Sequence, residues 1–167
     1  MKTTTAMLHA ALLMAATAAV SMAPAQAAPG RAGIAYGNLG DQWRAPGEVE
    51  DWYGALRRLR DGFDQICGDT FCEGDYSNIQ ALRFSCSAEP VSGRVGECAW
   101  AFAASQEEVD PHTGRIEVEA KHWSCRIPLR PGTRARALLT ALAVEEPLHA
   151  PLPGSSNTIY DALIDCL

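Results

Sequence analysis

Apolar residues recur at three- and four-residue steps from Pro46 onward, which places them on one stripe of a helix. The stripe consists of Val49, Trp52, Tyr53, Leu56, Leu59, Phe63 and Ile66. Acidic residues, Glu48, Glu50 and Asp51, crowd its start and arginines come later, which is the order that the helix dipole favours. The pattern predicts an N-terminal amphipathic helix.

Two later segments alternate between apolar and polar residues, as half-buried strands do. The apolar positions are Leu82, Phe84 and Cys86 in the first segment and Cys98, Trp100 and Phe102 in the second. A hairpin closed about Ser92 joins them through a turn-rich connector. In that register the facing pairs are Cys86 with Cys98, Phe84 with Trp100, and Leu82 with Phe102.

A third strand is predicted from Arg115 to Ile127, after turn-forming residues at 110–114. Its apolar positions change phase: Ile116, Val118 and Ala120 share one parity, and Trp123, Cys125 and Ile127 share the other. Such a change of phase indicates a β-bulge near Lys121 and His122.

Two C-terminal helices follow. Thr133 can cap the first, which ends before Pro147, and Ser156 or Asn157 can cap the second. The chain is therefore expected to form a disulfide-stapled α+β domain, in which an N-terminal amphipathic helix and two C-terminal helices pack on a three-stranded antiparallel meander.

The first residues have the parts of a secretory signal: Lys2, an apolar run from Ala6 to Val20, and a small-x-small site at 25–27. We expect a signal peptide over 1–27, a flexible N-terminal arm over 28–45 and a single α+β domain over 46–167. The apolar run is shorter than a bilayer span, so no membrane insertion is expected and the predicted location is periplasmic or secreted.

All six cysteines follow that segment, in a compartment where disulfides persist. Six cysteines allow fifteen connectivities. The hairpin register favours Cys86 with Cys98, and proximity favours Cys67 with Cys72. The pair that remains is Cys125 with Cys166, which would tie the third strand to the last helix.

The formal net charge is −6 and becomes −7 when Lys2 is removed with the signal peptide. Nucleic acid and anionic membranes are therefore not expected as partners, and a basic protein is favoured. The candidate contact surface is the ring from Cys67 to Cys72 with its acidic flank. Its residues are Asp69, Phe71, Glu73, Asp75 and Tyr76, with Phe71 as an exposed aromatic tip.

A stapled acidic loop can enter the cleft of a cationic enzyme, because the disulfide removes ordering cost before binding. A solvated connector and a calcium site are the alternatives, although the Asp-x-Asp-x-Asp-Gly pattern of calcium loops is absent. Zinc is not expected because exported cysteines oxidise. No metal or other cofactor is predicted.

The spacing from Cys67 to Cys72 resembles that of a cysteine-bridged loop in a periplasmic family of vertebrate lysozyme inhibitors. That loop carries a histidine, whereas residues 68–71 here are Gly, Asp, Thr and Phe. The resemblance therefore implies the kind of loop and carries over no inhibitory residue.

The sequence predicts a binding protein, an inhibitor or immunity-type partner of a basic peptidoglycan hydrolase or toxin. The alternatives are a small secreted hydrolase using His122 for acid–base chemistry and a purely structural envelope protein. No nucleophile elbow, metalloprotease helix or phosphate-binding glycine loop accompanies the histidine, so no catalytic residue is assigned.

Overall fold

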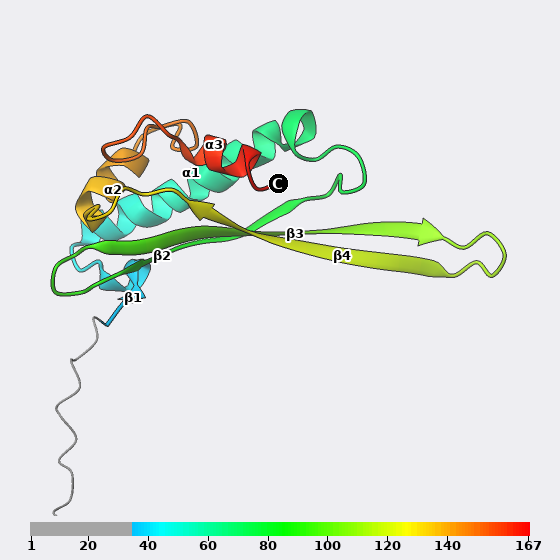
Figure 1. The fold of residues 1–167 in the computed structure, drawn as a ribbon, viewed down its shortest axis with the longest axis horizontal. Coiled ribbons are helices and arrows are strands. Elements are labelled where there is room, and N and C mark those ends of the chain that lie inside the picture. The colour runs from blue at the N-terminus through cyan, green and yellow to red at the C-terminus, as the bar shows by residue number, and fades with distance from the viewer. Residues whose placement is uncertain (1–34) are drawn as a thin grey trace, which may run out of the picture. The chain divides into compact units, whose positions relative to one another are not determined.

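The computed structural model describes residues 35–167, which form an α+β fold with one four-stranded antiparallel sheet and three α-helices. The elements are β1 (Gly37–Asn38), the 3-10 helix η1 (Leu39–Gln42), α1 (Pro46–Thr70), β2 (Gln80–Ala88), β3 (Val95–Val109), β4 (Ile116–Ile127), α2 (Ala135–Leu142) and α3 (Ile159–Ile164). The strands lie in the order β1-β2-β3-β4, and the α-helices cover one side of the sheet (Figure 1). We call that side the inner face. The predicted signal peptide lies outside the described residues.

Helix α1 supplies the centre of the core. Pro46 opens it in the first turn, where the missing N–H has no intrahelical partner to lose. Phe63 is fully buried and packs within 6 Å of the rings of Trp100 and Phe102 on β3. Burial of each such aromatic side chain contributes about 2–3 kcal/mol. A helix begins at Pro46, as predicted, and it continues to Thr70, but Tyr53 of the predicted apolar stripe is 46% exposed.

The β2–β3 hairpin confirms two of the three predicted pairs, Cys86 with Cys98 and Phe84 with Trp100. The third pair was wrong. Ala81 lies opposite Phe102, because the register shifts between Ala81 and Arg83. Leu82, the extra residue, is turned out of the core and half exposed, and Arg60 donates a hydrogen bond to its carbonyl oxygen over 2.8 Å.

The predicted three-stranded meander is corrected to four strands, because β1 pairs with the end of β2. The prediction of a flexible N-terminal arm is wrong over residues 37–43. Leu39 and Trp43 are buried in the core, and the Gln42 side chain donates a hydrogen bond to the Ala88 carbonyl over 2.8 Å. This short segment is fixed by two apolar anchors rather than by a long strand.

Strand β4 follows β3 without interruption from Cys98 opposite Ile127 to Val109 opposite Ile116. The bulge predicted near Lys121 and His122 is therefore wrong. The apolar residues do change parity along β4, but only its second half is buried: Ile116 and Val118 are exposed on one face, whereas Cys125 and Ile127 are buried on the other.

The two C-terminal helices are present, with different caps from those predicted. Thr133 lies two residues before α2, and its hydroxyl donates to the Arg130 carbonyl over 2.7 Å. Helix α3 is capped by Thr158, whose side chain and that of Asp161 form a capping box. Neither Ser156 nor Asn157 takes that role.

All three disulfides join the pairs that the sequence favoured: Cys67–Cys72, Cys86–Cys98 and Cys125–Cys166. The last joins β4 to the residues after α3 across a separation of 41 residues. No helix of residues 35–167 is both long and apolar enough to cross a membrane. Disulfides in this number are typical of exported proteins.

Candidate functional site

Strands β3 and β4 continue well beyond β2. Gln80, the first residue of β2, pairs with Ala103. Asn78 then ends the pairing: its side-chain oxygen accepts a hydrogen bond from the Ser105 N–H at 2.9 Å, and its amide nitrogen donates to the Ser105 hydroxyl at 3.1 Å. Past this point the two strands form a two-stranded ribbon, residues 105–120, that projects from the sheet (Figure 1).

Asp110 organises the turn at the end of the ribbon. Its carboxylate accepts hydrogen bonds from the His112 N–H at 2.8 Å and from the Thr113 hydroxyl at 2.7 Å. These hydrogen bonds, of which the one from the Thr113 hydroxyl has the largest effect, hold the pKa of Asp110 below its usual value because they favour the charged form. Gly114 supplies the positive φ that closes the turn.

The ribbon has two chemically different faces, because alternate residues of a strand point to opposite sides. The inner face continues from the buried Phe102 and Ala104 and carries Gln106, Glu108, Glu117, Glu119 and Lys121. The outer face carries Ser105, Glu107, Val109, Ile116, Val118 and Ala120. Carboxylates therefore gather on one face and aliphatic side chains on the other.

The inner face is acidic and lacks ion pairs within the ribbon. Glu108 lies opposite Glu117 across the strands, and Glu119 follows on the same face, around a shallow hollow. The ion pairs found among residues 35–167 are Arg126 with Glu97 and Arg136 with Glu48, and both lie elsewhere. The side chains of Glu108, Glu117 and Glu119 are exposed, so their negative charge is accessible to a partner.

The prediction that Phe71 is an exposed aromatic tip is wrong. Phe71 is half-buried, with its ring centroid 5.8 Å from that of Phe63 and 6.0 Å from that of Tyr160. It is the C-cap residue of α1, and its N–H donates to the Cys67 carbonyl over 3.0 Å. The ring closed by Cys72 thus turns Phe71 back onto the core.

Tyr76 connects the loop after the ring to the ribbon. Its hydroxyl donates a hydrogen bond to Oε1 of Glu119 over 2.9 Å, and its ring meets Trp123 edge to face at 5.7 Å. The ammonium of Lys121 lies 5.0 Å from the Tyr76 ring centroid and 5.1 Å from that of Trp123. The hydrogen bond to Glu119, with smaller contributions from burial and from the charges of Glu119 and Asp75, raises the pKa of Tyr76.

The structure therefore divides the five predicted contact residues. Tyr76 contacts the ribbon, and the negative charge of Asp75 helps to raise the pKa of Tyr76. Asp69 and Glu73 are exposed, whereas Phe71 belongs to the core edge. Sequence reasoning did not select three carboxylates on the ribbon, Glu108, Glu117 and Glu119, because carboxylates on an exposed strand edge are usually only solvated. Glu117 and Glu119 do alternate along a predicted strand, which signals a shared face. We call Glu73, Asp75, Glu108, Glu117 and Glu119 the acidic surface.

Other chemistry is not assembled among the described residues. Across residues 35–167, no three His, Cys, Asp or Glu side chains are grouped so that they could share a metal ion. His122 is exposed on the outer face, opposite Ala103, and no side-chain hydrogen bond joins it to another residue within this part of the chain.

Comparison of the chain with family models, curated proteins and solved structures finds no match.

Proposed function

We propose that this protein is an exported binding protein that engages a basic protein through the acidic surface. The candidate partners are cationic peptidoglycan hydrolases and toxins, toward which it acts as an inhibitor or immunity-type protein. The observation that carries the proposal is the contact of Tyr76 with Glu119, because it joins two acidic segments, the loop and the ribbon.

Charge supports a basic partner. Carboxylates concentrated on one surface produce a field that extends about a Debye length, roughly 8–10 Å at physiological salt. Lys121 lies on the inner face next to the ribbon, and its ammonium lies over the Tyr76 and Trp123 rings. The field therefore attracts a cationic surface and speeds its approach.

Rigidity supports binding without a large ordering cost. The Cys67–Cys72 ring fixes one end of the loop, and the Tyr76 contacts with Glu119 and Trp123 fix the other. A preorganised loop loses little conformational freedom when a partner binds. The projecting ribbon adds a narrow element that can enter a concave site.

Binding to a set of basic peptidoglycan hydrolases, including a c-type lysozyme, tests the proposal. Association rates are measured at 50 and 300 mM salt, together with lysis of cell-wall substrate. We expect a complex whose association slows steeply with salt and whose formation reduces lysis. An acidic hydrolase of similar size serves as the control partner.

A charge-neutral triple variant, Asp75→Asn, Glu117→Gln and Glu119→Gln, should slow association at least tenfold at low salt. The matched control neutralises three exposed carboxylates outside the acidic surface, Glu50, Glu145 and Glu146. Equal loss in both variants would mean that only net charge matters, and it would reject the acidic surface as the site.

A further inference from the structure

The outer face of the ribbon is an exposed apolar surface. Val109 and Ile116 each keep 66% of their surface exposed and Val118 keeps 63%, and all three lie on the same face. A two-stranded ribbon is marginally stable in water when nothing packs on it, and flat apolar strands tend to pair with other chains. This face is therefore suited to being covered.

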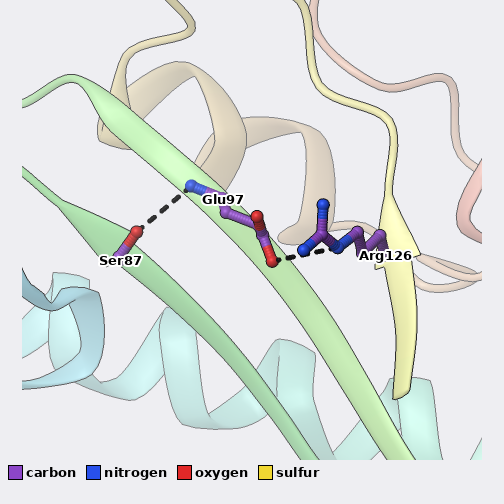
Figure 2. Close-up of polar contacts among 3 residues, drawn as sticks. All are labelled: Ser87, Glu97 and Arg126. Carbon is purple, nitrogen blue, oxygen red and sulfur yellow. Dashed lines mark hydrogen bonds and ion pairs between the residues drawn. The ribbon is translucent and has the colours of Figure 1, made fainter. Parts of the chain in front are cut away.

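The same outer face is smooth where the strands join the sheet. Ala99, Ala101 and Ala103 occupy its middle strand, and the helices lie on the opposite side (Figure 1). The alanines of β3 leave a shallow floor, which is flanked on β4 by His122, Ser124 and Arg126. The floor ends at Glu97, whose N–H donates to the Ser87 hydroxyl at 3.1 Å and whose carboxylate lies 3.5 Å from Nε of Arg126, as Figure 2 shows.

Along β3, larger side chains at one end of the face and alanines at the other make this strand complementary to a second copy of itself. We propose that a second copy of this chain covers it, with the two β3–β4 ribbons packed face to face and antiparallel about a two-fold axis. If the axis passes midway between Ala99 and Val109, each Val109 lies over the partner copy's alanine at position 99. Glu107 then lies over position 101. Such an interface is isologous, so every contact occurs twice.

Charge favours the same arrangement. Glu107 is the one carboxylate on the outer face of the ribbon. Arg83 of β2 lies opposite Ala101 of β3 and therefore shares the outer face. Its Nε donates a hydrogen bond to the hydroxyl of Ser85 over 3.0 Å. Packing position 107 over position 101 brings Glu107 of one copy beside Arg83 of the other. The acidic surfaces lie on the inner faces and point away from the interface.

The size of the face predicts a dimer of modest affinity. β3 and β4 pair at twelve positions, from Cys98 with Ile127 to Val109 with Ile116, and this length is roughly 40 Å at about 3.3 Å per residue. Covering it removes on the order of 1,000 Å² from water in total, the low end for specific interfaces. We therefore expect dissociation in the micromolar range.

Sedimentation of the full chain between 1 and 200 μM tests the inference directly. We expect a monomer–dimer equilibrium that Val118→Asp weakens at least tenfold. Glu117→Gln, on the opposite face of the same strand, is the matched control and should leave the equilibrium unchanged or slightly stronger. Both residues are exposed, so neither change should unfold the protein.

A charge exchange tests the identity of the occupant. Glu107→Arg or Arg83→Glu alone should weaken the dimer several-fold, and the double variant should restore it, because the pair is then reversed in both copies. A partner of another kind would not show this rescue.

Three results would overturn the inference: a monomer at 200 μM, a dimer without charge-exchange rescue, or binding to phosphatidylglycerol vesicles that Val118→Asp abolishes. Val118→Asp should leave hydrolase binding intact, since that surface faces the other way. The dimer and the proposed function can therefore fail separately.

Discussion

The phenol of Tyr76 donates a hydrogen bond to the carboxylate of Glu119, 43 residues later in the chain, over 2.9 Å. Tyr76 belongs to the loop after the Cys67–Cys72 ring, and Glu119 lies at the base of the ribbon. Since the Tyr76 ring also meets Trp123, one side chain positions the loop against the strand. The spatial relation between the two acidic segments therefore depends on this residue.

The first prediction concerns the order of that loop. Tyr76→Phe removes the hydroxyl but keeps the ring against Trp123, whereas Tyr76→Ala removes both contacts. Hydrogen exchange over residues 73–79 should increase slightly in the phenylalanine variant and strongly in the alanine variant. The melting temperature should change little in the phenylalanine variant and fall in the alanine variant, because the Tyr76 ring is partly buried and packs against the core. Unchanged hydrogen exchange in Tyr76→Ala would show that the Cys67–Cys72 disulfide alone orders the loop.

The second prediction concerns pH. The pKa of Tyr76 is raised above its usual value of 10.0, first by the hydrogen bond to Glu119. A raised folded-state pKa means that the stabilisation is present below the unfolded-state pKa and is lost as pH rises through the folded-state value. Ultraviolet titration at alkaline pH, taken as the difference between the wild-type chain and Tyr76→Phe, isolates this phenol. Glu119→Ala should shift its titration to lower pH, and the absence of such a shift would remove Glu119 as the cause.

Much of the fold could be predicted because its signals are local. Phe84 and Cys86 alternate with polar residues over one strand, and Cys98 and Trp100 do the same over the next, so one register satisfies both. The bulge at Leu82 could not be predicted, since an extra residue in a strand changes neither composition nor alternation enough to be recognised. Trp43 was missed because a two-residue strand and a short 3-10 helix have no periodic pattern.

The candidate site was less predictable for a different reason. Phe71 has polar neighbours in the sequence, and its stacking on Phe63 depends on how the chain reverses at the end of α1. The ribbon depends on β3 continuing past Ala104 through residues too polar to indicate a strand. Only the pairing of Glu108 with Glu117 shows that the carboxylates of two strands share a face.

The third prediction concerns the buried N-terminal segment. Trp43 is 8% exposed, and its ring centroid lies 6.1 Å from that of Trp52. Trp43→Ala should lower the free energy of unfolding by about 3–5 kcal/mol, as large-to-small changes in cores do. Urea denaturation measures this, with Tyr36→Ala as the control because Tyr36 is half exposed. A loss below about 1 kcal/mol would restore the view of this segment as a flexible arm.

The last prediction ranks the disulfides by the loops they close. In the chain-entropy model a bond across 41 residues, Cys125–Cys166, stabilises by about 4 kcal/mol, and one across five, Cys67–Cys72, by about 2 kcal/mol. Paired alanine variants compared by urea denaturation should follow that order. The Cys67/Cys72 variant should instead show the larger increase in hydrogen exchange near residue 76, because its ring acts on the loop. If removing Cys67–Cys72 destabilised the whole domain as much as removing Cys125–Cys166, the ring would be part of the global fold, and the argument that it preorganises a contact surface would lose its basis.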